Sequence, residues 1–458
     1  MRTRRRVGWD VIRLQKADPI AEDEADVVPA ETTPGPGVRK SMFRALRVRN
    51  YRLYAMAQLI SLTGTWMQRV AQDWLVLDIS NSGTILGLLT TLQFGPSILI
   101  SPLGGVLADR VDKRRLLMAT QTAQASCALV LGLLVLADRV QLWHVVTLAG
   151  CLGVVTAIDA PARQSFVIEM VGVEDMPNAV AMNSTIFNLG RVLGPSIAGF
   201  VIAAVGTGYA FVGNAAATLV VVVAMLAMRV EELIRSPRIA RAKGQLRDAV
   251  GYIRARPAVW VPMALAAVVG VFGQSLQLTA ALLARKVFDL GADAYGLLTT
   301  ATALGAVTAA IMATRRSTAK TNAQLLLAAF LFGAAEVLSG VVPNFLGTTM
   351  AMAVVGFCMV SFATAANAAV QIGIEATMRG RVMALYLVCT IGGGSIGSPI
   401  IGWCAQTFGP RPAIVGAGII VMTASVALAG YLARTGRMSR RMLIERAVTL
   451  LPAGARRF

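Results

Sequence analysis

Long apolar segments recur along most of the chain, and they constrain its fold more than any other feature. Of 458 residues, 56% are hydrophobic and 15% are charged, so the chain has too few polar residues to cover a soluble protein of this size. Segments of about 20 apolar residues have the length of helices that cross a lipid bilayer. The sequence therefore predicts an all-α membrane protein with twelve transmembrane helices. Their predicted positions are 53–78, 84–107, 115–137, 143–161, 178–204, 209–228, 258–283, 294–313, 322–341, 343–365, 381–406 and 412–434.

The chain is strongly basic, and the positions of its basic residues decide what its net charge of +19 means. A basic patch on a soluble domain would indicate nucleic-acid binding. Here 37 of the 43 Lys and Arg residues lie in tails and loops on one side of the predicted helices, and only 4 lie on the other side. Such asymmetry is typical of the cytoplasmic segments of membrane proteins. We predict a multi-pass protein of the cell (inner) membrane, with both termini in the cytoplasm and no nucleic-acid partner.

The longest predicted cytoplasmic connection divides the helices into two groups of six. The sequence predicts an N-terminal half at 41–228, a central loop at 229–257 and a C-terminal half at 258–434. A disordered cytoplasmic tail at 1–40 precedes them, and a basic cytoplasmic tail at 435–458 follows. The low hydrophobicity of the tail at 1–40 predicts that this segment does not fold by itself.

Short sequence matches relate the two halves to each other. GLLTT occurs at 87–91 and again at 296–300, each time at the start of the second helix of its half. GPSIAG at 194–199 has a counterpart, GSPIIG, at 397–402. Repeats of this kind are typical of transporters in which two halves move around a binding site near the membrane midplane.

The segment GGVLADRVDKRRLL at 104–117 connects the second and third predicted helices. It resembles the G-x-L-a-D-R-x-G-r-k signature of the major facilitator superfamily, with Asp112 in place of the second glycine. The matching residues include Gly105, Asp109, Arg110, Lys113 and Arg114. The resemblance implies that this loop is a latch of a cytoplasmic gate; the alternative is a solvated loop that only sets the topology.

The expected latch contacts follow from the charges of that loop. Asp109 is expected to bind the positive N-terminal end of the eleventh helix, near Arg381. Lys113 or Arg114 is expected to pair with Asp159 at the cytoplasmic end of the fourth helix.

The fifth helix resembles a second pattern of the same superfamily, g-x-x-x-G-P-x-x-G-G, which is associated with exporters that exchange substrate for protons. The matching residues are Gly190, Gly194, Pro195 and Gly199, and Ala198 replaces one glycine. Glycines let helices approach closely, and proline frees a backbone bond so that a helix can bend. Ordinary packing of small residues is the alternative interpretation.

Three further segments sharpen the resemblance toward siderophore-exporter-like and actinobacterial drug-efflux-like members of the superfamily. They are Arg49–Leu77, Asp159–Val171 and Met378–Leu385. An arginine that is common in the fourth helix of proton-coupled drug exporters is missing between Trp143 and Ile158. Proton coupling through an arginine of the fourth helix, the usual route in those exporters, is therefore not predicted for this chain.

Few ionisable residues fall well inside the predicted helices. They are Arg69 and Asp73 in the first helix, Arg191 in the fifth and Glu336 in the ninth. A charge at the bilayer centre costs about 2.5 kcal/mol or more, so each should face protein or water. We interpret Glu336 as structural or as snorkelling toward the membrane surface, because its helix is peripheral in the resembled superfamily.

The other intramembrane charges fall on helix faces that predict a shared cavity. Helical spacing places Trp66, Arg69 and Asp73 on one face of the first helix, and Asn188 with Arg191 on one face of the fifth. Arg191 either neutralises Asp73 or contacts substrate, and the sequence leaves both alternatives open. Asp73 is the candidate proton carrier, since burial can raise the pKa of a carboxyl group.

The sequence favours a secondary active exporter that couples protons to a small molecule, such as a siderophore or another secreted metabolite. The alternatives are a multidrug pump for hydrophobic cations and, more remotely, a membrane scaffold or sensor without transport. No G-x-x-x-x-G-K-[ST] segment is present, so ATP hydrolysis by this chain is not predicted. We predict a monomer that is no enzyme and needs no cofactor or metal.

Overall fold

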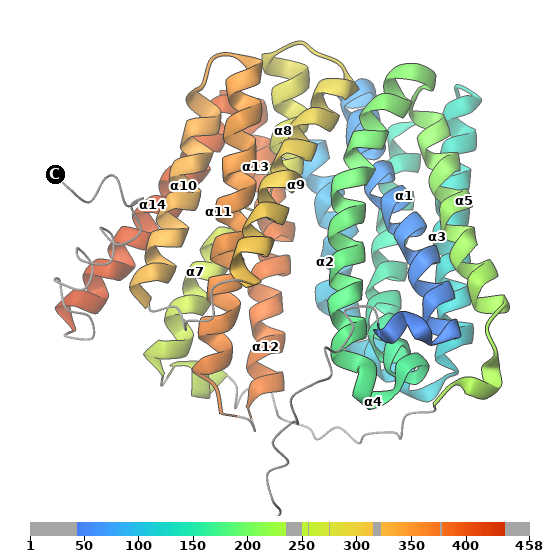
Figure 1. Cartoon of the computed structure of the whole chain (residues 1–458). Helices are drawn as coiled ribbons and strands as arrows, with labels where there is room; N and C mark the ends of the chain where they lie inside the picture. The colour runs from blue at the N-terminus through green and yellow to red at the C-terminus, as the bar shows by residue number, and fades with distance from the viewer. Residues whose placement is uncertain are drawn as a thin grey trace, which may run out of the picture. The chain divides into compact units, whose positions relative to one another are not determined.

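The protein is described here by a computed structural model that covers residues 44–234, 250–254, 256–273, 275–314, 322–375 and 378–435. Within these ranges all regular secondary structure is helical (Figure 1). The predicted tail at 1–40, most of the basic tail and residues 235–249 of the central loop lie outside them.

The helices follow one another along the chain in two sets. The N-terminal half comprises η1 (Arg44–Arg47), α1 (Arg49–Ser80), α2 (Gly83–Arg110), α3 (Lys113–Leu136), α4 (Leu142–Val205) and α5 (Thr207–Leu226). The short helix η2 (Val230–Glu232) follows α5. The C-terminal half comprises α7 (Pro257–Gly273), α8 (Leu276–Leu282), η3 (Leu283–Val287), α9 (Ala292–Thr314), α10 (Asn322–Val341), α11 (Phe345–Ile372), α12 (Arg379–Leu387), η4 (Val388–Gly392), α13 (Gly393–Phe408) and α14 (Pro410–Arg434).

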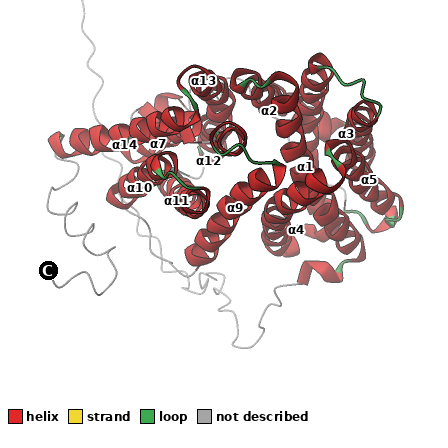
Figure 2. Cartoon of the chain, turned by 90° about the horizontal axis from the view of Figure 1, so that it is seen from above, coloured by secondary structure: helices red, strands yellow, loops and turns green. Residues whose placement is uncertain are grey.

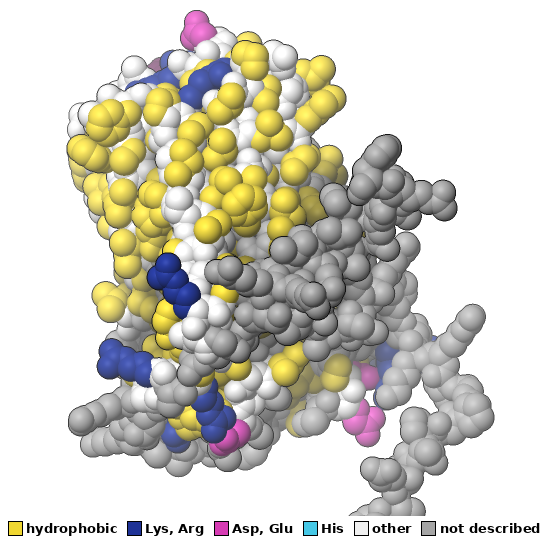
Figure 3. Space-filling model, turned by 90° about the vertical axis from the view of Figure 1, so that its left-hand side faces the viewer, with side chains coloured by type: hydrophobic (Ala, Val, Ile, Leu, Met, Phe, Trp, Pro, Cys, Tyr) yellow, Lys and Arg dark blue, Asp and Glu magenta, His cyan; other side chains and the backbone are white. Residues whose placement is uncertain are grey.

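Eleven helical segments in the described part of the chain are long and apolar enough to cross a membrane. The first predicted helix corresponds to α1, which has 32 residues and would span about 48 Å but is not among the eleven. Its sequence is less apolar because it carries Gln68, Arg69, Gln72 and Asp73. Figure 3 shows hydrophobic side chains over the middle of one face and charged ones toward its two ends, as a lipid-facing surface requires.

The predicted loop between the fourth and fifth helices is largely helical, so this boundary was wrong. α4 runs for 64 residues, and only Gly172, with φ 73°, leaves the helical conformation. A glycine adopts this left-handed conformation without steric cost, so one residue suffices to connect two membrane spans. The extension buries Phe166, Val167 and Met170 in a cluster with Tyr54, which explains why the helix continues beyond residue 161.

Two other predicted helices are divided. The predicted helix at 258–283 appears as α7 and α8, and the one at 381–406 as α12, the π-helix η4 and α13. η3 is also a π-helix, directly after α8. Such wide turns are frequent at functional sites.

Among the described residues, the two halves share a hydrophobic core at one end of the bundle only. We call this the upper end; it is where α1 ends at Ser80 and α2 begins at Gly83, at the top of Figure 1. One cluster there joins residues of both halves, such as Leu77 and Ile401. Two further clusters contain residues of one half each. The lower ends of the halves therefore have separate cores.

Two helix pairs join the halves, and both use the repeated sequence motifs. α2 packs against α13, and the second span of α4 packs against α9, as the view from above shows (Figure 2). A Cβ atom at Gly87 would meet the backbone oxygen of Ser398. A Cβ atom at Gly296 would lie 2.9 Å from the Cα atom of Gly199. Each GLLTT segment thus packs closely against the small-residue motif of the opposite half.

Candidate functional site

Two arginines and three aromatic rings meet between α1, α2 and α4. The Cζ atom of Arg69 lies 4.7 Å from the ring centroid of Trp66 and 4.6 Å from that of Phe94. The Cζ atom of Arg191 lies 6.0 Å from the centroid of Trp66, and Phe187 packs edge-on against the same indole at 5.7 Å. We call these five residues the Trp66 cluster.

The glycines of the predicted exporter motif make this cluster possible. At Gly194, a Cβ atom would lie 2.8 Å from the backbone oxygen of Thr63 and would collide with the Cβ atom of Trp66. At Gly190, it would lie 3.0 Å from the Cβ atom of Leu62. These two glycines therefore let α4 approach α1 closely enough to bring Arg191 beside the indole, while helical geometry continues through Pro195.

The two arginines of the cluster form no ion pair among the described residues, although Asp73 lies near enough to attract the charge of Arg69. Neither Arg69 nor Arg191 makes a hydrogen bond or an ion pair there, and both side chains are half-buried. Of the two alternatives for Arg191, an ion pair that neutralises Asp73 is therefore not formed. Asn188 donates to the backbone oxygen of Ser184 on its own helix, at 2.8 Å.

Asp73 is bound instead by a residue of the other half. The hydroxyl group of Tyr295, in the first turn of α9, donates a hydrogen bond of 2.7 Å to its carboxylate. The ring of Tyr295 also stacks on Trp74, with 6.5 Å between centroids. Both residues are buried, so this contact lies inside the core that the halves share.

Polar contacts across the upper end surround that hydrogen bond. Arg285 pairs with Asp78 at 3.2 Å and lies over the ring of Trp74. Gln406 accepts hydrogen bonds from the backbone N–H of Gly83, at 2.9 Å, and from Lys286, at 2.8 Å. Within the described residues, the Arg285–Asp78 pair is the only ion pair that joins the halves.

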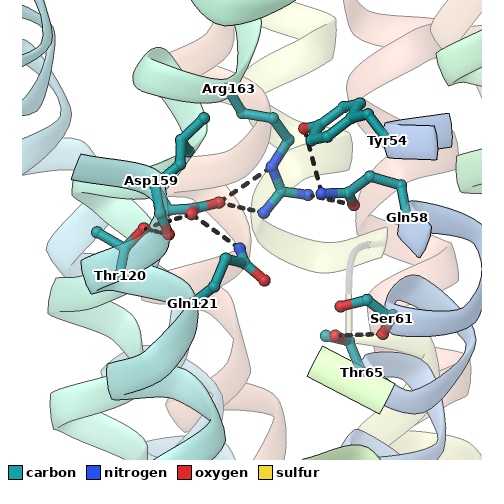
Figure 4. Close-up of polar contacts among 9 residues, drawn as sticks. Tyr54, Gln58, Ser61, Thr65, Thr120, Gln121, Asp159 and Arg163 are labelled. Atoms are coloured by element: carbon teal, nitrogen blue, oxygen red, sulfur yellow. Dashed lines mark hydrogen bonds and ion pairs between the residues drawn. The ribbon is translucent and has the colours of Figure 1, made fainter. Parts of the chain in front are cut away.

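A buried polar network lies within the lower part of the N-terminal half (Figure 4). Asp159 has no exposed surface; it pairs with Arg163 and accepts hydrogen bonds from Thr120, at 2.7 Å, and Gln121, at 2.9 Å. Arg163 also donates to Gln58 at 3.2 Å. Every oxygen of the Asp159 carboxylate thus has a partner from α3 or α4.

The predicted pairing of Lys113 or Arg114 with Asp159 is wrong. Lys113 pairs with Glu169 at 2.5 Å, and Arg114 donates to the backbone oxygen of Met225 at 2.8 Å. The reason is the extension of α4, which places Arg163 one turn after Asp159 and carries Glu169 down to the start of α3. The same extension puts Arg163 on the fourth membrane span, beyond its predicted end at residue 161.

The predicted contact of Asp109 with the start of the eleventh helix lies outside what the structure describes. The surroundings of Gly105 and the side chain of Asp109 are not described, and Arg110 is exposed. Arg381 donates to the sulfur atom of Met378 at 3.6 Å. The latch therefore stays a prediction.

Tyr295, Arg285, Phe94 and Arg163 were missed by the sequence analysis. Tyr295 and Arg285 lie near helix ends, where polar residues are common and their presence in the sequence does not indicate a site. Phe94 is one of many apolar residues of α2. The one available signal was the repeat, because Tyr295 directly precedes the second GLLTT segment.

Known proteins with similar sequences are transporters. The family model described as transmembrane secretion effector matches residues 40–446. The staphyloferrin A transporter of Staphylococcus aureus is 23% identical over 76% of this chain and 87% of its own. The enterobactin exporter EntS of Shigella flexneri is 22% identical over 82% of this chain and 90% of its own.

Solved structures show the same fold at lower sequence identity. A bacterial homologue of the human lysosomal transporter Spinster, inward-facing and occupied, has a TM-score of 0.66 at 16% identity, covering 85% of this chain and 97% of its own. A POT family transporter in complex with 5-aminolevulinic acid has a TM-score of 0.67 at 10% identity, covering 84% and 96%. With a family model matched along almost its whole length, the chain belongs to the transmembrane secretion effectors, transporters of the major facilitator superfamily and not enzymes.

Proposed function

We propose that this protein exports a siderophore or a similar secreted metabolite by alternating access, in exchange for protons. The observation that carries the proposal is the difference between the two ends of the bundle. The halves share a core and an ion pair at the upper end, and their cores are separate at the lower end. A transporter that is closed on one side and open on the other has this arrangement.

The topology follows from the charge distribution. The lower end, with η1 and the central loop, is cytoplasmic. α1 also crosses the membrane, which brings the number of spans from eleven to twelve. With an even number of spans, both termini lie in the cytoplasm. The described conformation is then inward-open. In the outward-open conformation, Asp109 of the cytoplasmic loop binds the start of α12 and latches the lower end, as the family signature implies.

The substrate class is supported by the relatives and by the Trp66 cluster. The similar transporters are named for staphyloferrin A and enterobactin. Arg69 and Arg191 supply two cations that form no hydrogen bond or ion pair among the described residues, which suits a substrate that carries negative charge or many hydrogen-bond acceptors. A multidrug pump for hydrophobic cations would use the rings of Trp66, Phe94 and Phe187, but the two arginines repel such substrates.

Asp73 is the proposed proton site because it connects the two halves. Its carboxylate accepts the Tyr295 hydrogen bond in the described conformation, in which the upper end is closed. Opening of the upper end breaks this bond and exposes Asp73 to the outside, where it takes up a proton. Closure then carries the proton inward, and its release to the cytoplasm balances the export of one substrate molecule.

Export is tested in cells with and without the protein. Iron-chelating metabolites in the medium and loading of a fluorescent lipophilic cation are measured before and after an uncoupler. We expect more secreted chelator with the protein, a loss of this increase after the uncoupler, and no change in dye loading. Asp73→Asn should abolish the part of chelator secretion that the uncoupler abolishes. Lower dye loading with unchanged secretion would favour the multidrug alternative and contradict the proposed substrate class.

A further inference from the structure

Arg69 offers hydrogen-bond donors in one particular direction. Its guanidinium carbon lies over two aromatic rings, those of Trp66 and Phe94. A guanidinium group is planar, and its N–H donors point outward within that plane. Contacts with ring faces leave these donors unused, and no acceptor among the described residues takes them. A ligand that approaches in the plane finds a pair of parallel donors, which matches a carboxylate group.

A second cation faces the same indole from another helix. Arg191 comes from α4 and Arg69 from α1, and both guanidinium carbons lie within 6.0 Å of the Trp66 centroid. Two cations of like charge repel each other in an apolar region, where their electrostatic interaction is strong. Cation–π contact with one indole offsets this only partly. Two negative groups would neutralise both cations.

A buried amide beside the cluster also lacks a partner. Gln72 follows Arg69 by three residues, on the same side of α1, and is 1% exposed. Its Oε1 atom accepts a hydrogen bond from Gln93 at 3.2 Å, but its Nε2 donor has no acceptor. Gln93 is adjacent to Phe94 of the cluster. The environment of the cluster therefore contains several N–H donors that have no acceptor among the described residues.

We propose that the Trp66 cluster binds a small polycarboxylate, with one carboxylate on the N–H edge of Arg69 and another on Arg191. This inference rests on the proposed export function and names the chemical class of its substrate. The carbon skeleton between the carboxylates lies against Trp66 and Phe187, which excludes water from both ion pairs. Asp73, one turn from Arg69 on α1, attracts its charge without forming an ion pair, and Tyr295 holds the carboxylate by a hydrogen bond.

Equilibrium binding of radiolabelled citrate to the purified full chain in detergent tests this directly. Sodium chloride is used to hold ionic strength constant. We expect saturable binding that unlabelled tricarballylate displaces and that acetate or triethyl citrate, the uncharged ester of the same skeleton, does not displace. Arg69→Gln and Arg191→Gln should each weaken binding about 10-fold or more, since each removes a charge-assisted hydrogen bond. Arg69→Lys should recover only part of the affinity, because lysine cannot bind a carboxylate with two parallel donors.

Arg411 provides a matched control. Its guanidinium carbon also lies over an aromatic ring, that of Phe288 at 5.6 Å, but it donates to the backbone oxygen of Pro343 at the upper end. Arg411→Gln should leave citrate binding unchanged. Equal effects of all three glutamine variants would overturn the proposal, as would displacement of citrate by tetraphenylphosphonium or an absence of saturable binding.

The two proposals fail in different experiments. If uncoupler-sensitive secretion is present and citrate does not bind, export stands and the polycarboxylate class is wrong. If citrate binds through both arginines and secretion is absent, the cluster is an anion site and the export function is wrong.

Discussion

The two ends of the bundle hold their helices together in different ways. At the upper end, contacts join the two halves through glycines, a shared core and exposed or hydroxyl-mediated polar contacts. At the lower end, each of the described ion pairs lies within one half, and they include Asp159–Arg163, whose carboxylate is fully buried. Strong interactions thus stabilise each half as a unit, and weaker ones close the upper end. A gate that must open in every cycle needs contacts that are weak individually.

The largest expected effect is the loss of the Asp159–Arg163 pair. Arg163→Gln leaves the fully buried Asp159 without its cation and should cost about 3–5 kcal/mol of stability. Arg229→Gln, in an exposed pair of the same half, should cost about 0–1 kcal/mol. Thermal unfolding in detergent ranks the two variants. Similar melting temperatures of the two variants would show that the buried pair does not stabilise its half more than an exposed pair does.

A smaller effect is expected where the halves approach through glycine. Gly87→Ala places a Cβ atom against the backbone of Ser398 and should destabilise the closed upper end by about 1–3 kcal/mol. Gly150→Ala is the control, because a Cβ atom there meets nothing within 4 Å. Maleimide labelling of a cysteine at the buried Leu298, in a background without native cysteines, reports opening. Faster labelling is expected for Gly87→Ala only; equal labelling in both variants would argue against this packing.

The hydrogen bond of Tyr295 should contribute less. Tyr295→Phe keeps the ring on Trp74 and removes the donor to Asp73, which should weaken the closed end by about 1 kcal/mol, or about fivefold in population. The same labelling assay measures it, with Tyr431→Phe as the control on α14. An unchanged labelling rate would show that the stacking contact alone closes this region.

The smallest effect belongs to the exposed ion pair. Asp78 and Arg285 are each 41% exposed, so Asp78→Asn should change the free energy of closure by about 0–1 kcal/mol. The effect should shrink further as salt rises, because exposed charges are screened. Labelling at low and high salt checks this. If Asp78→Asn destabilised the closed upper end as much as Gly87→Ala does, the ion pair and not close packing would be what closes it.

Much of the candidate site was predictable because it depends on spacing along single helices. Trp66, Arg69 and Asp73 share a face of α1, and an intramembrane arginine must avoid lipid, so a site that contains Trp66, Arg69 and Arg191 followed from the sequence. The partner of Asp73 did not follow, because Tyr295 lies 222 residues away in the chain. The partner of Asp159 was missed for a local reason: one glycine replaced the expected loop and extended the helix through Arg163.

Composition, charge asymmetry and family signatures by themselves determined that this is an all-helical membrane transporter, because the length of apolar segments and the cost of intramembrane charge are local properties. The sequence also showed which motifs repeat. Only the tertiary structure decided that each GLLTT segment packs against the opposite half, that the upper end is closed, and that Asp73 binds Tyr295 while Arg69 and Arg191 form no hydrogen bond or ion pair with any described residue. These features depend on how close two helices approach and which side chains then reach each other, and distance along the chain does not encode that geometry.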